Sequence, residues 1–102
     1  MKIELKTNEN KYLEFTIKDN DGEYFNLTDY VATMQIQKYG ESTLSVNSGC
    51  SISNAAGGKV MYLYNSTLTA GEYSGEIELT SSAGRRYVTP SFEVDVTASL
   101  PS

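Results

Sequence analysis

Apolar and polar residues alternate in short runs along most of the chain. In residues 31–37, for example, Ala32, Met34 and Ile36 are separated by single polar residues. Because successive side chains of a strand point to opposite faces of a sheet, this pattern predicts a strand with one buried face. Runs of the same kind predict strands at residues 3–5, 13–17, 25–27, 60–64, 73–79 and 86–96, with two weaker strands within 39–53.

Turn-forming residues separate these runs. Residues 19–22 (Asp-Asn-Asp-Gly) form the first such group, and glycine-containing groups follow at 54–58 and 81–84. Glycine, asparagine and aspartate adopt the backbone conformations that tight turns need. No window of a dozen residues shows the apolar spacing of a helix. The pattern predicts an all-β, immunoglobulin-like, two-sheet antiparallel β-sandwich of about seven to eight strands, with one domain at 1–97 and a short polar tail at 98–102.

The inward-facing positions of the predicted strands define the expected core. Pro90 interrupts the last strand, and because proline cannot donate a ladder hydrogen bond, it is expected at a bulge or an edge. The predicted core residues are Leu13, Phe15, Ile17, Met34, Ile36, Val60, Tyr62, Tyr73, Ile77, Phe92 and Val94.

Leu68, Gly71 and Tyr73 resemble a tyrosine corner. In that motif a tyrosine at the start of a strand returns its hydroxyl to the backbone a few residues upstream. The predicted role of Tyr73 is therefore structural.

Charge argues against two classes of partner. The net charge is −5 at pH 7, whereas a nucleic-acid binder needs a basic stripe to neutralise phosphates. The adjacent pair Arg85-Arg86 lies in a predicted hairpin, where a solvated turn explains it. An acidic surface is also repelled by membranes that carry anionic lipid. We expect neither a nucleic-acid nor a membrane partner.

The residue types needed for catalysis are scarce. The chain has no histidine, which is the commonest general base, and Cys50 is its only cysteine. Glu76 and Glu78 lie on the same face of one strand and are the remaining candidates for a catalytic carboxylate pair. A solvated outer face explains them better. The acidic residues 19–23 offer oxygen ligands for calcium, but an Asx-type hairpin turn explains them better, since the glycine does not stand at the EF-hand position. We predict no enzyme activity and no cofactor.

Residues 60–64 break the half-buried pattern. Alternation places Val60, Tyr62 and Tyr64 on one face, and it leaves Met61 and Leu63 on the other. A two-layer sandwich buries one face of each sheet, so a loop from residues 39–53 or a neighbouring subunit is expected to cover the second. We predict a partner interface at Met61 and Leu63, with the unpaired edge beside Pro90 as a further candidate for strand addition.

The order of these elements resembles the immunoglobulin-like N-terminal domain of baseplate upper proteins and related siphophage tail proteins. The resemblance covers about 85 residues, and no single motif in it is specific. The matching segments, in chain order, are the strand 13–17, the turn 19–22, Leu27-Thr28, the strand 32–36, the Ala-Ala-Gly-Gly-Lys-Val run of 55–60 with Tyr62, the Thr-Ala-Gly-Glu-Tyr run of 69–73, Gly84 and Pro90. A baseplate upper protein continues into receptor-facing regions, whereas this sequence ends at Ser102.

The resemblance implies a phage virion structural protein that docks onto other particle proteins in multiple copies. Tail or baseplate is favoured, with head or fibre attachment as alternatives. Without an apolar stretch of signal-peptide length, synthesis is expected in the host cytoplasm, followed by incorporation into the virion. The alternative function is carbohydrate binding for host attachment, with Tyr24, Tyr39 and Tyr87 as exposed stacking platforms.

Overall fold

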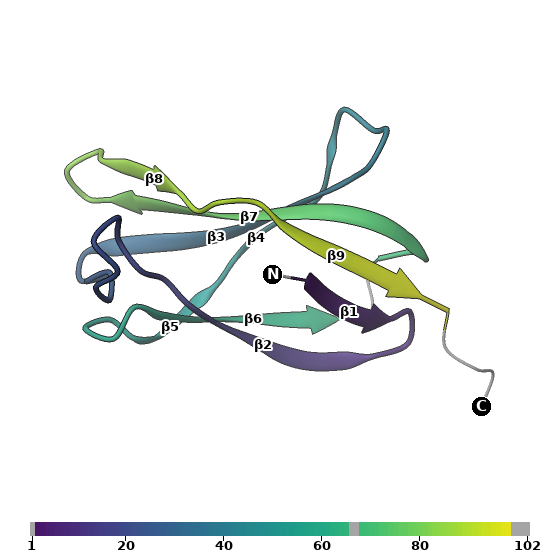
Figure 1. Cartoon of the computed structure of the whole chain (residues 1–102), viewed down its shortest axis with the longest axis horizontal. Coiled ribbons are helices and arrows are strands. Elements are labelled where there is room, and N and C mark those ends of the chain that lie inside the picture. Colours follow the sequence, from purple (N-terminus) through teal and green to yellow (C-terminus); the bar gives the residue numbers. More distant parts are fainter. Residues whose placement is uncertain (1, 66–67, 99–102) are drawn as a thin grey trace.

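The computed structural model describes residues 2–65 and 68–98, in which every regular element is a strand (Figure 1). The predicted tail at 98–102 lies outside the described residues except for Ala98. The strands within the described ranges are β1 (Lys2–Lys6), β2 (Asn10–Thr16), β3 (Tyr30–Lys38), β4 (Leu44–Gly49), β5 (Ser51–Asn54), β6 (Lys59–Asn65), β7 (Gly71–Ser81), β8 (Arg86–Val88) and β9 (Phe92–Thr97).

The strands form two sheets, which Figure 1 shows as two layers. The larger sheet has the order β1-β9-β7-β3-β4, with β8 also paired to β7, and the smaller has the order β2-β6-β5. In immunoglobulin terms the smaller sheet matches strands B, E and D, and the larger matches G, F and C with one added strand beside C. The predicted immunoglobulin-like sandwich is therefore confirmed.

One strand pairing departs from the antiparallel prediction. β1 runs parallel to β9, with Lys2 opposite Glu93 and Lys6 opposite Thr97. The chain then crosses to the smaller sheet, where β2 pairs antiparallel with β6. Alternation within β1 indicates a strand but not its direction relative to a partner 91 residues away. The sequence pattern therefore cannot specify this pairing.

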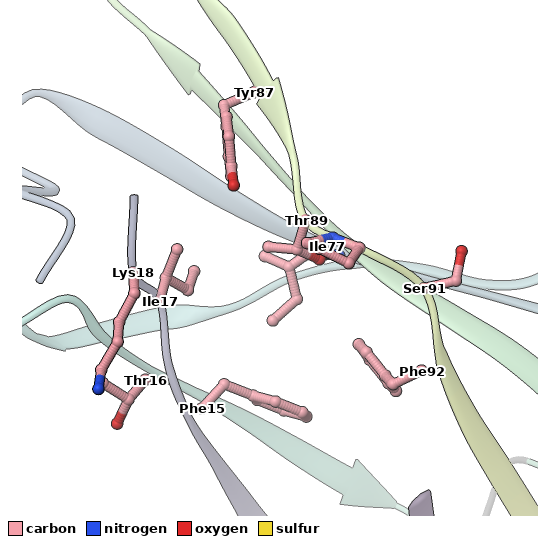
Figure 2. Close-up of a pocket in the computed structure, with 10 residues that line it drawn as sticks. Phe15, Thr16, Ile17, Lys18, Ile77, Tyr87, Thr89, Ser91 and Phe92 are labelled. Carbon is pink, nitrogen blue, oxygen red and sulfur yellow. The ribbon is translucent and has the colours of Figure 1, made fainter. Parts of the chain in front are cut away.

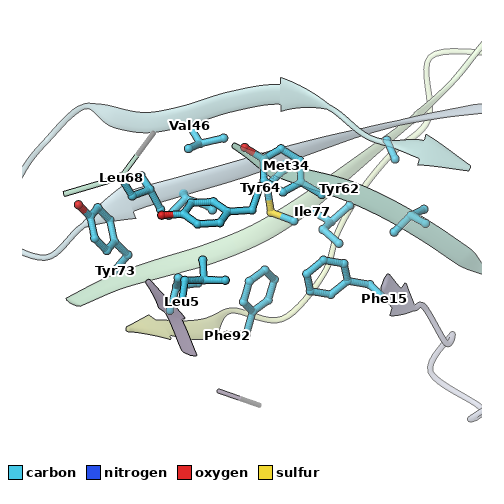
Figure 3. Close-up of a cluster of buried hydrophobic side chains, with 14 of the residues drawn as sticks. Leu5, Phe15, Met34, Val46, Tyr62, Tyr64, Leu68, Tyr73, Ile77 and Phe92 are labelled. Atoms are coloured by element: carbon cyan, nitrogen blue, oxygen red, sulfur yellow. The ribbon is translucent and has the colours of Figure 1, made fainter. Parts of the chain in front are cut away.

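The core fills the space between the sheets (Figure 3). The Phe15 ring of β2 and the Phe92 ring of β9 lie 5.3 Å apart between centroids and join the two layers. All predicted core residues are buried except Leu13, which is partly exposed. Leu13 faces inward as predicted, but β2 is an edge strand of the smaller sheet. Its inner side chains therefore have a neighbouring strand on one side only.

The predicted strand at 25–27 is absent from the described structure. Phe25 donates its backbone N–H to the Ile17 carbonyl at 2.9 Å, whereas Leu27 donates to Ala55 at 2.9 Å. Because these hydrogen bonds go to two different segments, no continuous ladder forms. One isolated bridge, between Lys18 and Tyr24, lies just before this segment.

The predicted last strand is divided at Pro90. Val88 of β8 lies opposite Glu78, and Phe92 of β9 lies opposite Gly75. Three residues, 89–91, therefore face two residues of β7, which is the geometry of a β-bulge. Thr89 holds the bulge in place, because its N–H donates to the Ile77 carbonyl at 3.0 Å and its hydroxyl accepts from the Ile77 N–H at 2.9 Å. The prediction of a bulge at Pro90 is confirmed.

The tyrosine corner is also confirmed. Tyr73, near the start of β7, donates its hydroxyl hydrogen to the Thr69 carbonyl at 2.7 Å. This bond fixes the chain where it enters the longest strand of the larger sheet.

Candidate protein-docking surfaces

The outer face of the smaller sheet carries an apolar cluster, which we call the outer patch. It consists of Tyr12 from β2 with Met61 and Leu63 from β6. Tyr12 lies directly opposite Leu63 in the strand register, and the two side chains are 64% and 47% exposed. Met61 is half-buried beside them. Exposed apolar side chains that lie side by side form a typical centre for a protein–protein contact, with the surrounding polar residues as its rim.

The segment 39–53 covers the outer patch only in part. Residues 45–49 of β4 line an open groove of about 370 Å³ together with Tyr62, Leu63 and Asn65. This segment therefore flanks Leu63 on one side, but almost half of the leucine side chain stays exposed. The described part of the 39–53 segment therefore does not cover the outer patch completely. The other expected cover, a neighbouring subunit, stays a prediction.

Sequence reasoning missed Tyr12 as a member of the outer patch. Leu13 and Phe15 point inward, so alternation in β2 already places Tyr12 on the outer face. Its position opposite Leu63 depends on the register between β2 and β6, which only the structure supplies.

A second surface lies where the two sheets separate beside Pro90. An open groove of about 230 Å³ lies between the end of β2 and the bulge that links β8 to β9. Figure 2 shows side chains that line it. Pro90 and Ser91 are exposed at its rim, opposite Thr16 and Lys18. The apolar residues that line it are Phe15, Ile17, Ile77, Tyr87 and Phe92. Its apolar lining and polar rim fit a large apolar side chain.

The three tyrosines of the carbohydrate hypothesis are not equivalent. Tyr24 and Tyr39 are 59% and 57% exposed, as predicted for stacking platforms. Tyr87 is not: it is partly buried, and its ring lies 5.2 Å from that of Phe25 between centroids. The prediction of Tyr87 as an exposed platform is wrong, because the Phe25 ring packs against it.

Tyr39 borders a polar groove on the outer face of the larger sheet. The groove has a volume of about 310 Å³, and polar side chains from β3 and β7 form its floor. Its polar lining includes Gln35, Gln37, Ser74 and Glu76. An exposed ring beside amide, hydroxyl and carboxylate groups is a combination that can stack on a sugar and hydrogen-bond its hydroxyls.

The acidic turn after β2 has the geometry of an Asx turn. The Asp19 carboxylate accepts hydrogen bonds from the backbone N–H groups of Asp21 at 2.9 Å and Glu23 at 3.0 Å. These bonds explain Asp19 without a metal ion. Among the described residues, no group of three acidic or cysteine side chains is placed to hold a metal. Those residues also include no helix long and apolar enough to span a membrane.

Burial changes the ionisation of several groups without creating a reactive centre. It raises the pKa of the half-buried Cys50 thiol to about 11, so the thiol is protonated and weakly nucleophilic at neutral pH. Burial likewise raises the pKa of Tyr62 and Tyr64. At the surface, a hydrogen bond to Asp95 raises the pKa of Lys2.

Comparison with known proteins shows similarity of fold only. No family model and no curated protein matches it. The crystal structure of CopC from Methylosinus trichosporium OB3b superposes with a TM-score of 0.55 at 17% identity, covering 98% of this chain and 89% of that one. Murine CRIg superposes with a TM-score of 0.47 at 13% identity, covering 94% of this chain and 92% of that one. Extracellular domains 3–5 of Drosophila OTK superpose with a TM-score of 0.39 at 14% identity, covering 98% of this chain and 33% of that one.

The likeness to CopC and the strand order together define an immunoglobulin-like β-sandwich. At such low identity a shared fold carries no function with it. None of the three proteins is a phage baseplate protein, so the resemblance to siphophage proteins stays a prediction from the sequence.

Proposed function

We propose that the chain is a phage virion structural protein, a small immunoglobulin-like adaptor or decoration domain that docks onto other particle proteins. The proposal places it in the tail or baseplate, with the head or a fibre as alternative locations. The order of sequence elements supports the phage setting. The outer patch supports the docking role, because Tyr12 and Leu63 expose adjoining apolar surface on a sheet face.

The outer patch fits the centre of an interface. A stable contact of standard size needs about 800 Å² from each partner, which is more than three side chains supply. The polar neighbours Glu14, Thr16 and Lys59 lie on the same outer face and would form the rim. Such a centre excludes water when a partner covers it, and this burial supplies most of the binding free energy.

A charge substitution in the outer patch tests the docking role. The double variant Met61→Lys/Leu63→Lys should fold, since both side chains point away from the core, but should not be incorporated into particles. A matched control is Val31→Lys/Leu44→Lys, which replaces apolar residues that are 65% and 42% exposed outside the outer patch. Quantitative mass spectrometry of purified particles measures incorporation. A folded Met61/Leu63 variant incorporated at the parental level would contradict the docking role of this face.

The phage setting has its own test, independent of any variant. Particles purified from the phage that encodes the chain should contain it in a fixed copy number. Detection only in the soluble fraction of infected cells would refute a virion role while leaving the outer patch as a contact surface for another partner.

Carbohydrate binding is the second candidate, and the polar groove beside Tyr39 is the observation that favours it. A glycan array separates the two functions. Binding that is lost in Tyr39→Ala but kept in Tyr24→Ala would assign the groove as a sugar site. A blank array would leave the docking role as the better proposal.

A further inference from the structure

Among residues 2–65 and 68–98, no strand pairs with the outer edge of β2 in the smaller sheet. An immunoglobulin sandwich of the constant type has a fourth strand there, in the order A-B-E-D. In this chain β1 pairs with β9 in the larger sheet instead, and the described smaller sheet ends at β2. β1 begins opposite Glu93 of β9, so its pairing with the larger sheet stops short of the Pro90 bulge.

The register shows which backbone groups face this open edge. The Ile17 N–H donates to the Gly58 carbonyl at 2.7 Å, and the same register pairs Phe15 with Val60. In an antiparallel pair, residues alternate between groups that bond to the neighbour and groups that point away from it. The N–H and C=O groups of Tyr12, Glu14 and Thr16 therefore point outward, at the spacing with which another strand would bond.

The groove beside Pro90 lies at the end of the same edge. Its inner surface is formed by the inward-facing Phe15 and Phe92, with Tyr87 and Ile77 above them in Figure 2. The bulge at 89–91 lines this groove, where Thr89 is anchored to Ile77 while Pro90 and Ser91 stay exposed. A strand beside β2 would alternate its side chains between the outer face and this apolar space.

We propose that the outward edge of β2 at residues 12–16 binds an extended segment of a partner protein by β-strand addition, with one large apolar side chain of that segment inserted in the groove lined by Phe15, Tyr87 and Phe92. The segment alternates apolar residues, which face the groove, with polar residues beside Glu14 and Thr16. Main-chain hydrogen bonds provide affinity in this recognition mode, and the pocket provides specificity. The inference rests on the proposed docking function, since it names a protein ligand, but it uses the backbone edge of β2 and the groove rather than the apolar side chains of the outer patch.

An extended segment fits this site better than a second copy of the chain does. If two β2 strands paired edge to edge through these outward groups, centred on Glu14, the two Glu14 carboxylates would face each other, and like charges in directly opposed positions destabilise a sheet. The inward side chains Leu13 and Phe15 of the second copy would also point into their own core. They could not fill the groove of the first copy.

Peptides selected from a random dodecapeptide library on the full chain provide the probe. The selected peptides should alternate apolar and polar residues and slow amide hydrogen exchange at Tyr12, Glu14 and Thr16 at least tenfold. Thr16→Pro, which removes one outward N–H that β6 does not use, should weaken binding at least tenfold, whereas Thr16→Ala should not. Ser91→Trp should block the groove, with Ser82→Trp in the exposed 81–84 turn as the matched control. Thermal melting confirms that each variant is folded.

The outcomes separate this site from the outer patch. Peptide-induced NMR shifts confined to the side chains of Met61 and Leu63, or equal binding to Thr16→Pro and Thr16→Ala, would overturn strand addition while leaving the proposed docking function intact. Failure to select any peptide, or a dimer of the chain that Thr16→Pro dissolves, would also overturn it. Loss of particle incorporation in Met61→Lys/Leu63→Lys tests the docking function separately and should leave peptide affinity unchanged.

Discussion

Phe15 and Phe92 are the residues on which the contact between the two sheets most depends. Their rings touch across the sandwich, and the Phe92 ring also packs over Gly75, where a Cβ atom would come within 2.5 Å of it. Glycine at this position therefore has a packing role, because only the lack of a side chain leaves room for the ring.

Truncation of this pair should be severe. Phe92→Ala is expected to lower the free energy of unfolding by about 3 to 5 kcal/mol, which combines lost burial with a cavity. That loss is comparable to the whole stability of a small domain. Urea unfolding measures it, with Leu63→Ala on the exposed outer patch as a control that should change stability by less. Similar midpoints for the two variants would contradict the assignment of Phe92 to the core.

The thiol of Cys50 gives a prediction about pH. Burial raises its pKa from 9.0 to about 11 in the folded chain, so the unfolded chain loses this proton at lower pH. Between about pH 9 and 11 the unfolded state binds fewer protons, and stability must fall as pH rises. Cys50→Ala should unfold with a shallower dependence on pH in this window and an unchanged dependence between pH 6 and 8. Identical slopes for the variant and the parent above pH 9 would refute the raised pKa.

At the scale of the element, the turns differ in how strictly they require glycine. Gly58 has φ +67°, and a Cβ there would lie 2.4 Å from the Ile17 carbonyl oxygen. Gly84 has φ +86° with no atom within 4 Å of such a Cβ, so only the backbone conformation disfavours a side chain. The first turn is held between two backbone segments, and the second projects into open space.

Alanine at these two positions separates conformational strain from steric overlap. Gly84→Ala should cost about 1 to 2 kcal/mol, the penalty for a left-handed conformation. Gly58→Ala should cost distinctly more, because the backbone of Ile17 must also move. Denaturant midpoints of the two variants provide the comparison. Equal losses would show that the contact with Ile17 relaxes without cost.

Strands of alternating pattern were the most predictable elements. The run at 31–37 lies within β3, and Pro90 divides β8 from β9 as its missing N–H requires. Residues 25–27 were not predictable in the same way, because their hydrogen bonds go to Ile17 and Ala55 rather than to one partner strand. Alternation reports which face a side chain takes, but it carries no information about the partner of a strand.

The same limit applies to the candidate sites. Met61 and Leu63 were identified from the apolar character of both faces of one strand. Tyr12 could be placed beside them only from the register of β2 with β6. Tyr87 was wrongly predicted to be exposed, because its contact with Phe25 links residues far apart in the sequence. A local pattern predicted exposure at single positions, whereas grouping them into a surface required the fold.

At the scale of the whole molecule, charge is distributed unevenly. Glu72 of β7 and Glu4 of β1 both lie opposite Asp95 of β9, so three carboxylates stand in one row across the outer face of the larger sheet. Lys2 neutralises part of this charge through an ion pair with Asp95 at 2.9 Å. The row places like charges in directly opposed positions, which destabilises a sheet.

Reversal of one charge in this row should stabilise the chain. Glu72→Lys is expected to raise the free energy of unfolding by about 0.2 to 1 kcal/mol in low salt, because it replaces a repulsive cross-strand pair with an attractive one. The gain should shrink in 0.5 M salt as screening increases. Glu41→Lys makes the same charge change in a loop and serves as the control. An equal gain in that control would assign the effect to net charge rather than to the row.

The parallel pairing of β1 with β9 has a mechanical consequence. Lys2 and Thr97 lie at opposite ends of this strand pair, since the two strands run in the same direction. A force that pulls these residues apart therefore slides one strand along the other and loads all the hydrogen bonds between them at once. An antiparallel pair pulled from adjacent ends would instead open one bond at a time. Forced unfolding is governed by the rate of crossing the unfolding barrier, so this arrangement favours a module that holds its shape under tension.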